Sequence, residues 1–326
     1  CSIVATNSAG PGPASASVSV TPNGGPPPKA FITNQTTNNV SVLDTGSNTV
    51  TATITVGANP FGIDVNPAGT RAYVANFSSN TVSLLDTVNN NVVATTAVGT
   101  GPIGVAYNPA GTRVYVGNGT SNNVSVIDTS TVGVIATIPV GTNPRGIAVN
   151  PAGTRVYVAS LLSNNVSVID TASNTVLTTV GVGVRPEGVT VNPAGTRVYV
   201  GNFTSNSVSV IDTASNAVVD TVAVGTAPRG VAFNPAGTRV YVANANSNNV
   251  SVIDTTTNTV IATVAAGTSP RGVSVNPSGT RVFVANTNSN NVTVIDTATN
   301  SVVTTVTVGG NPAAFGAFIG GSPPTD

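Results

Sequence analysis

The chain has 326 residues, with 34 glycines and 22 prolines, and only 7% of its residues are charged and 4% aromatic. Its formal net charge is zero, which leaves no electrostatic basis for binding nucleic acid or an anionic membrane surface. There is no histidine or methionine, and Cys1 is the only cysteine. The composition therefore excludes a nucleophile–histidine triad, a zinc or haem site built on those residue types, and an intrachain disulfide.

The first 28 residues stand apart from the rest of the chain. Residues 1–22 form apolar and polar runs on either side of Asn-Ser-Ala-Gly-Pro-Gly-Pro at 7–13, which predicts two short strands and a turn. Residues 23–28, Asn-Gly-Gly-Pro-Pro-Pro, are typical of a linker. The hairpin resembles the last one of a fibronectin type III or immunoglobulin-like domain, which implies that the rest of such a sandwich lies upstream. A lipid anchor at Cys1 is the alternative, and we favour it less because a tether needs no hairpin pattern.

From Lys29 onwards the sequence repeats with a fixed period. The stretch Asn-Pro-Ala-Gly-Thr-Arg-Val-Tyr-Val-Ala-Asn, complete at 234–244, recurs with little change, and its arginine returns every 42 residues. Six arginines and one lysine hold this position: Lys29, Arg71, Arg113, Arg155, Arg197, Arg239 and Arg281. Such a period takes precedence over the two or three ordinary domains that the length alone would predict.

Each period predicts four short strands separated by turns rich in Asn, Gly, Pro and Thr. In one copy they cover residues 230–233, 239–243, 249–254 and 259–266, and we name these strands A, B, C and D. Four strands in a repeat of about 42 residues are the signature of a β-propeller blade.

The chain enters the repeat at a strand B and leaves it at a strand A. Residues 313–319, Ala-Ala-Phe-Gly-Ala-Phe-Ile, are in register with strand A of the other copies. We expect this last strand to pair beside Phe31 in the first strand B, so that both ends of the repeat build one blade. The predicted fold is an all-β, closed seven-bladed propeller over residues 29–319, followed by a polar tail at 320–326.

The recurring Tyr-Val-Ala-Asn or Tyr-Val-Gly-Asn, followed by Val-Ser-Val-Ile-Asp-Thr, closely resembles the YVTN family of β-propellers over residues 29–319. The resemblance implies an extracellular or cell-surface protein, because that family occurs mainly in exported proteins of bacteria and archaea, surface-layer proteins among them. Many members of the family have no defined ligand.

Stacking the periods gives columns with a structural interpretation. We expect an aromatic column in strand B to pack adjacent blades together: Phe31, Tyr73, Tyr115, Tyr157, Tyr199, Tyr241 and Phe283. A glycine opens strand A in six copies, with Ala314 in the seventh, which fits crowding at the axis. The Arg or Lys that begins strand B should form an ion pair with the Asp that ends strand C of the same blade. The alternative, or additional, role of this Asp is to cap the turn that follows it.

The charges outside these columns are more informative. Arg145, Arg229 and Arg271 share the position that precedes strand A, Glu187 holds it in a fourth blade, and Arg185 lies two residues earlier than Glu187. These side chains should ring one mouth of the channel, on three or four adjacent blades. They predict either a weak site for an anionic small molecule or, as we favour, solvated charges beside a pore, partly paired with Glu187.

Apolar residues interrupt the small polar residues of the loops from B to C, on the same face. They are Phe77, Leu161, Leu162 and Phe203. They predict either a partner-binding surface or, as we prefer, side chains folded over the blade edge.

Other chemistry has little basis in the sequence, and we predict no cofactor or metal site. A carboxylate pair for glycoside hydrolysis would need Asp64 and Glu187 together, but they fall on blades 2 and 5, roughly across the ring. Formal glycosylation sequons also serve as the start of strand C, at Asn39, Asn123, Asn165, Asn249 and Asn291.

Three functional hypotheses follow. The one we favour is a non-enzymatic extracellular or cell-surface scaffold or adhesion module with a protein or cell-surface partner. Its support is the family resemblance, the low charge, the lack of catalytic residues and the uniformly short loops. The second is a subunit of a self-assembling surface layer or filament, in which residues 1–22 add a strand to another copy. The third is binding of an anionic small molecule at the arginine-lined mouth.

Overall fold

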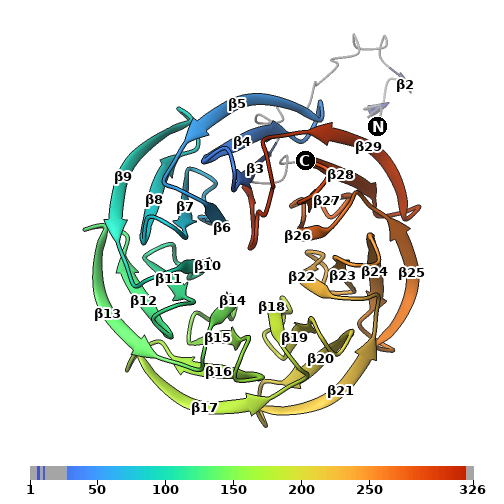
Figure 1. The fold of residues 1–326 in the computed structure, drawn as a ribbon. Helices are drawn as coiled ribbons and strands as arrows, with labels where there is room; N and C mark the ends of the chain where they lie inside the picture. Colours follow the sequence, from blue (N-terminus) through green and yellow to red (C-terminus); the bar gives the residue numbers. More distant parts are fainter. Residues whose placement is uncertain (1–5, 8–9, 12–27, 321–326) are drawn as a thin grey trace.

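The computed structural model describes residues 6–7, 10–11 and 28–320. Seven four-stranded antiparallel sheets are arranged as the blades of a ring around a central axis (Figure 1). This confirms the predicted all-β, seven-bladed propeller. Residues 6–7, 10–11 and 28–320 contain no apolar helix of membrane-spanning length.

Every blade has four strands, ordered from the axis outwards (Figure 1). The innermost strands, A, are β6 (Pro60–Val65), β10 (Pro102–Tyr107), β14 (Pro144–Val149), β18 (Pro186–Val191), β22 (Pro228–Phe233), β26 (Pro270–Val275) and β30 (Ile319–Gly320). The second strands, B, are β3 (Lys29–Asn34), β7 (Arg71–Asn76), β11 (Arg113–Asn118), β15 (Arg155–Ser160), β19 (Arg197–Asn202), β23 (Arg239–Asn244) and β27 (Arg281–Asn286). The third strands, C, are β4 (Asn39–Asp44), β8 (Thr81–Asp86), β12 (Asn123–Asp128), β16 (Asn165–Asp170), β20 (Ser207–Asp212), β24 (Asn249–Asp254) and β28 (Asn291–Asp296). The outer strands, D, are β5 (Thr49–Thr55), β9 (Asn91–Ala97), β13 (Gly133–Pro139), β17 (Thr175–Gly181), β21 (Ala217–Ala223), β25 (Thr259–Ala265) and β29 (Ser301–Thr307).

Blade 1 combines β30 with β3, β4 and β5, and blades 2 to 7 follow in chain order. Ahead of the ring, β1 (Thr6–Asn7) pairs with β2 (Gly10–Pro11), within the stretch where the sequence predicts a hairpin. Most of that hairpin, the linker up to residue 27 and the tail from 321 lie outside the described residues. The upstream sandwich therefore stays a prediction.

Strand A begins two residues earlier than the repeat predicts, and it contains a bulge. In blade 6, Pro228 pairs with Asn244, and the ladder then resumes only at Val231 and Val242. Proline is tolerated at the first residue of a strand, and a bulge re-aims the side chains within it. The bulge in this blade holds Arg229, so the arginine is displaced from the regular ladder.

The ring closes as expected, but not through a regular strand over 313–319. Only Ile319 and Gly320 form a strand with β3, although the backbone N–H of Phe31 also donates to the carbonyl of Phe318, 2.8 Å away. Ala314 has a φ of 39°, in the left-handed region, which ends the extended conformation. The carbonyl of Phe315 then accepts a hydrogen bond from Ile63 of blade 2 at 3.1 Å, so this segment joins two blades.

The aromatic column of strand B is buried, as predicted, with exposed fractions of 0–2%. Tyr73 of blade 2, for example, packs in one cluster with Val105, Val114 and Val116 of blade 3. The crowding at the axis is also confirmed, because a Cβ added to Gly230 would lie 2.4 Å from the carbonyl oxygen of Arg271 in the next blade.

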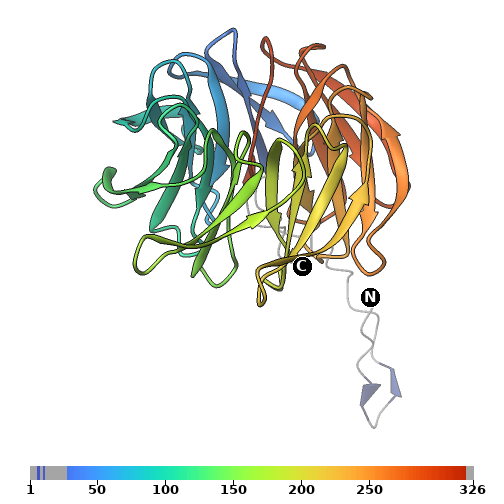
Figure 2. The same ribbon diagram turned by 60° about the horizontal axis from the view of Figure 1, so that its bottom comes forward.

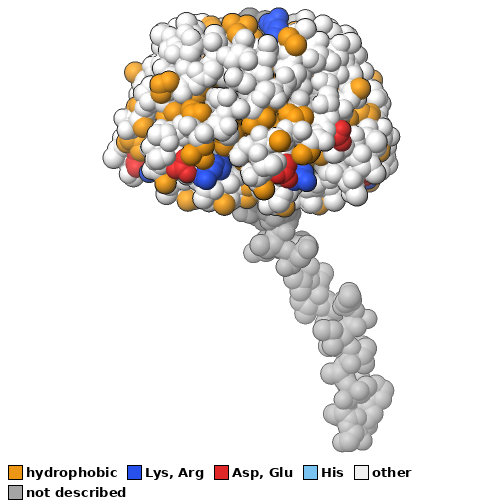
Figure 3. Space-filling model, turned by 90° about the horizontal axis from the view of Figure 1, so that it is seen from below, with side chains coloured by type: hydrophobic (Ala, Val, Ile, Leu, Met, Phe, Trp, Pro, Cys, Tyr) orange, Lys and Arg blue, Asp and Glu red, His pale blue; other side chains and the backbone are white. Residues whose placement is uncertain are grey.

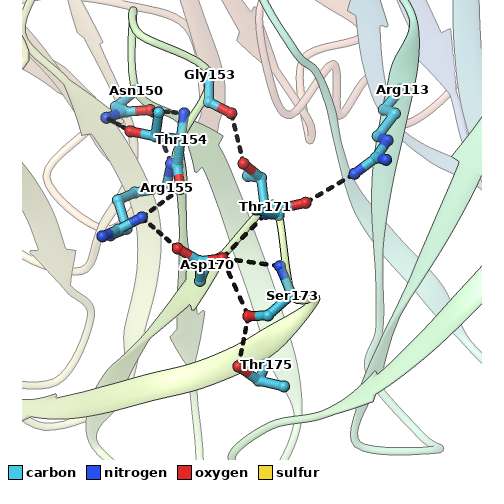
Figure 4. A network of polar contacts seen from close by, with 10 residues as sticks. Arg113, Asn150, Gly153, Thr154, Arg155, Asp170, Thr171, Ser173 and Thr175 are labelled. Carbon is cyan, nitrogen blue, oxygen red and sulfur yellow. Dashed lines mark hydrogen bonds and ion pairs between the residues drawn. The ribbon is translucent and has the colours of Figure 1, made fainter.

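The predicted pair between strands B and C forms in five blades and is wrong for blades 1 and 3. The pairs are Arg71–Asp86, Arg155–Asp170, Arg197–Asp212, Arg239–Asp254 and Arg281–Asp296. Arg113 instead donates to the carbonyl of Thr171 in blade 4, 2.7 Å away (Figure 4), and Lys29 to that of Thr87 in blade 2, 3.0 Å away. A long side chain at this position reaches the turn of the neighbouring blade as well as its own.

The aspartates at the ends of strands C also cap the turns that follow, as predicted. Asp170 Oδ1 accepts the backbone N–H of Ser173 at 2.8 Å while its other oxygen binds Arg155 (Figure 4). Equivalent backbone bonds occur in all seven blades.

The antiparallel meander gives the ring two distinct faces, since successive strands run in opposite directions (Figure 2). The lower face carries the turns from A to B and from C to D, with the charged pairs described above. In Figure 3, basic and acidic side chains accordingly lie next to one another along the lower rim. The upper face carries the loops from B to C and from D to A.

Candidate functional site

In every blade, the residue between a proline and the crowded position filled by glycine or Ala314 lies at the upper end of the channel, and in blades 2 to 7 it is the second residue of strand A. Around the ring from blade 2, these residues are Phe61, Ile103, Arg145, Glu187, Arg229, Arg271 and Ala313. Phe61, Ile103 and Ala313 are buried in one apolar cluster across blades 1 to 3. The four charged residues come from the adjacent blades 4 to 7. The upper mouth is therefore apolar on one side and charged on the other.

Glu187 and Arg229 form the ion pair that the sequence analysis anticipated. Arg229 Nη1 lies 3.1 Å from Glu187 Oε1 and 2.9 Å from Oε2. Their side chains are only 6% and 18% exposed. A carboxylate buried to this extent needs such a partner, because removing the arginine would leave an uncompensated charge.

Arg145 and Arg271 have no carboxylate partner within ion-pair distance among the described residues. Arg145 Nε donates to Asn143 Oδ1 at 2.8 Å. Arg271 places its Cζ 4.5 Å from the centroid of the Phe61 ring and directs Nη1 toward Gln35 Oε1 at 3.4 Å. Both contacts are with neutral groups, so neither arginine has a counter-ion in direct contact among the described residues.

Burial is the largest cause of the lowered pKa values of Arg145 and Arg271. It lowers the pKa of Arg271 to about 9, with repulsion from Arg229 as the next cause. It also lowers the pKa of Arg145, which Glu187 partly opposes. Both guanidinium groups stay protonated at neutral pH. Three arginines against one glutamate therefore leave an excess of two positive charges at the mouth of a chain whose net charge is zero.

Arg185 lies beside this group rather than within it, and it is exposed. Its Cζ lies 5.3 Å from the centroid of Phe203, and that of Arg229 lies 4.6 Å from the same ring. Phe203 thus supports two guanidinium groups. This places one of the predicted apolar residues next to the predicted charged ones.

The other apolar residues do not form one surface with Phe203. The ring of Phe77 lies against Phe61 at 6.2 Å and packs on the apolar cluster of the mouth. Leu161 is only 2% exposed, and its backbone N–H donates to the carbonyl of Asn143 at 2.9 Å. Leu161 therefore cannot belong to a partner-binding surface, and of this adjacent pair only Leu162 is exposed.

Asp64, on β6, is a channel residue that we did not propose as a site from sequence. A cavity of about 320 Å³ extends along the innermost strands, and Asp64, Thr190 and Ser274 are polar residues in its wall. Asp64 Oδ2 accepts the backbone N–H of Tyr107 at 2.6 Å. Burial raises the pKa of Asp64 to about 7. The sequence signal was there, because the equivalent residues of other blades, such as Ala106, are uncharged.

The described residues contain no group of three His, Cys, Asp or Glu side chains placed to hold a metal ion. The arrangement instead offers two kinds of chemistry. Protonated guanidinium groups at the upper mouth can bind an anion. The Asp64 carboxyl in the channel can exchange a proton near neutral pH.

Comparisons with known proteins agree on the fold. The model of the family described as "Lactonase, 7-bladed beta-propeller" matches residues 99–185 and 136–261. Together these segments span half of the 326-residue chain. No curated protein matches.

Two solved structures are similar. Kuenenia stuttgartiensis hydrazine synthase has 25% identity and a TM-score of 0.72, over 78% of this chain and 88% of that one. A functionally unknown protein from Desulfotomaculum acetoxidans has 19% identity and a TM-score of 0.79, over 91% and 99%. The second likeness shows the fold alone. By its match to the family model, the chain belongs to the family of seven-bladed β-propellers described as lactonase.

Proposed function

We propose that this propeller is a non-enzymatic binding module whose site is the arginine cluster at the upper mouth, and that its ligand carries a carboxylate or a similar anion. The observation that carries the proposal is the state of Arg145 and Arg271. Both are partly buried cations, and neither has a carboxylate partner among the described residues.

The physical argument is a balance of charge and solvation. A guanidinium withdrawn from water without a counter-ion loses hydration, and like charges nearby add repulsion. An anion at the mouth relieves both costs, and the forked donors of arginine suit a carboxylate. The pair between Glu187 and Arg229 lies in the middle of this arc and holds part of it in place.

We place this module outside the cell or at its surface. The support is the resemblance of the repeats to YVTN propellers, many of which have no defined ligand. A partner that is a protein, a cell-surface component or a second copy bound through residues 1–22 fits the same setting.

The test is thermal unfolding in the presence of succinate, citrate or phosphate at constant ionic strength. A ligand that binds only the folded state raises its stability by an amount that grows with concentration. Arg145→Gln with Arg271→Gln should abolish the rise. Arg71→Gln is the matched control, because that arginine lies on the lower face, 42% exposed. An equal rise in all variants would remove the arginine cluster as the site.

Lactone hydrolysis is the second candidate function. It is favoured by the family description and by Asp64, whose pKa of about 7 suits a general base that takes a proton from water attacking a carbonyl carbon. The lactone ring would open to a hydroxy acid. A panel of simple five- and six-membered lactones should then be hydrolysed by the wild type and not by Asp64→Asn. Equal rates in both would exclude this role for Asp64.

A further inference from the structure

The upper-face loops of blades 4 and 5 hold an exposed apolar pair that breaks the repeat. Leu162 is 58% exposed and Val184 is 47% exposed. Among the described residues, they are the only large apolar side chains exposed to this degree in upper-face loops, since the others lie in outer strands or, like Val88, in a lower turn. In Figure 3, hydrophobic side chains on the upper rim lie beside a basic side chain.

Hydrogen bonds connect the loop that carries Leu162 to segments that carry Arg145 and Arg185. The N–H of Leu162 donates to the carbonyl of Thr142 at 3.1 Å, and the residue after Thr142 accepts a hydrogen bond from Arg145 Nε at 2.8 Å. On the other side of the same loop, the N–H of Arg185 donates to Asn164 Oδ1 at 2.9 Å. The loop that carries Leu162 is thus held between two arginine-bearing segments.

Phe203 extends the same surface towards blade 6. Its backbone N–H donates to the carbonyl of Arg185 at 2.9 Å, and its ring lies under the guanidinium groups of Arg185 and Arg229. We call Arg145, Leu162, Val184, Arg185 and Phe203 the upper patch. It presents exposed apolar side chains beside Arg145 and Arg185, which have no carboxylate within ion-pair distance among the described residues.

We propose that the upper patch binds an acidic peptide segment that carries an apolar side chain, with its carboxylates at Arg145 and Arg185 and the apolar group on Leu162 and Val184. The proposal rests on the anion-binding function above and specifies its ligand. Arginine clusters recognise acidic motifs, and charge complementarity sets the choice of partner. The apolar pair lies outside the channel, so a small anion seated at the mouth leaves it uncovered, whereas a peptide on the surface covers both parts.

The experiment is fluorescence anisotropy with short labelled peptides and the whole chain. The test peptide alternates glutamate with leucine. One comparison peptide replaces leucine with serine, and another replaces glutamate with glutamine. We expect the glutamate–leucine peptide to bind about tenfold more tightly than either comparison peptide. The peptide without leucine loses the burial of an apolar side chain, and the peptide without glutamate loses the charge complementarity.

Two variants separate the apolar and charged parts. Leu162→Ser should weaken the glutamate–leucine peptide about 3- to 10-fold and leave the glutamate–serine peptide unchanged. Arg185→Gln should weaken both peptides by about threefold. The matched controls are Val88→Ser and Arg71→Gln, which change an exposed valine and an exposed arginine of the lower face. Both controls should bind all peptides like the wild type.

The inference fails if the glutamate–leucine and glutamate–serine peptides bind equally, if no peptide binds, or if Leu162→Ser has no effect. In each of these cases the stabilisation by succinate or citrate decides separately whether the anion site itself stands. Loss of both responses would overturn the proposed function together with this inference.

Discussion

The guanidinium of Arg271, on blade 7, lies 4.5 Å from the centroid of the Phe61 ring on blade 2, so one contact spans the blade that closes the ring. The neighbours of Phe61 in the apolar cluster include Ala313, which belongs to the closing segment. The contact thus joins the charged and apolar sides of the upper mouth.

A double-mutant cycle measures this contact. Phe61→Leu removes the aromatic face and Arg271→Gln removes the cation, and we expect a coupling of about 0.5–2 kcal/mol in the free energy of unfolding, as for a partly desolvated cation–π pair. Denaturant unfolding of the four proteins gives the number. Combining Phe61→Leu with Arg239→Gln on the lower face is the control and should be additive, and additivity in both cycles would contradict the contact.

Blade 4 lacks a buried amide that the other blades have. In blade 6, Asn244 Nδ2 donates to Ser251 Oγ and Asn249 Oδ1, both at 2.9 Å. In blade 4 a serine, Ser160, takes the equivalent position, and its hydroxyl has no hydrogen-bond partner among the described residues, nor has that of Ser167.

Restoring the amide should therefore stabilise the ring. We expect Ser160→Asn to raise the free energy of unfolding by about 1 kcal/mol and the Tm by about 2–4 °C. Asn244→Ser, the reverse change in blade 6, should lower both by a similar amount. Calorimetry of the two variants would contradict this explanation if Ser160→Asn were destabilising.

Asp64 should make stability fall as pH rises towards neutrality. Its pKa is about 7 in the folded protein against 3.8 ordinarily, so between these values the folded state binds more protons than the unfolded state. This contribution is fully present below about pH 4 and is lost as pH rises through about 7. Between these pH values, the free energy of unfolding of the wild type should fall by on the order of 2–4 kcal/mol relative to that of Asp64→Asn.

The comparison with Asp64→Asn cancels the opposite effect of the turn-capping aspartates. Hydrogen bonds from the turn are the first cause that lowers the pKa of Asp170, for example, so its contribution is lost as pH falls. Urea unfolding at several pH values measures the difference. Parallel profiles for the two proteins would show that the Asp64 carboxyl is not perturbed by burial.

On the lower face, the caps should matter more than the ion pairs. Asp254 accepts backbone N–H groups of the turn at 2.9 and 3.3 Å and also binds Arg239. The side chain of Arg239 is 36% exposed, and exposed pairs contribute about 0–1 kcal/mol. Arg239→Gln should therefore cost less than about 0.5 kcal/mol, and Asp254→Ala should cost more than Arg239→Gln because it also removes the hydrogen bonds of the turn. Equal costs in denaturant unfolding would assign the stabilisation to the pair instead.

Much of the fold could be predicted from the sequence because the repeat has no insertions. The period places Tyr73 and its equivalents in register, and burial of that column follows from packing between blades. The hydrogen-bond partners of Lys29 and Arg113 could not be predicted. A long, flexible side chain at this position reaches the aspartate of its own blade in some copies and a backbone carbonyl of the next blade in others. The irregular closing segment was also missed, since Ala314 adopts a left-handed φ that its residue type does not favour.

The candidate site was only partly accessible from sequence. Common register predicted that Arg145, Glu187, Arg229 and Arg271 share one mouth, because equivalent positions in a ring face the same opening. The bulge that carries them and the stacking on Phe61 depend on three-dimensional packing. Burial decided between Leu161 and Leu162, which are adjacent and chemically identical but differ in the direction their side chains take.

The most direct test of the central claim follows the arginine side chains themselves. In ¹⁵N-labelled protein, the Nε–Hε signals of the arginines are recorded during a titration with succinate. We predict saturable shifts for Arg145, Arg229 and Arg271, with none for Arg71 or Arg239 on the lower face. Uniform, non-saturating shifts of all arginines, or no shift at Arg145 and Arg271, would contradict an anion site at the upper mouth.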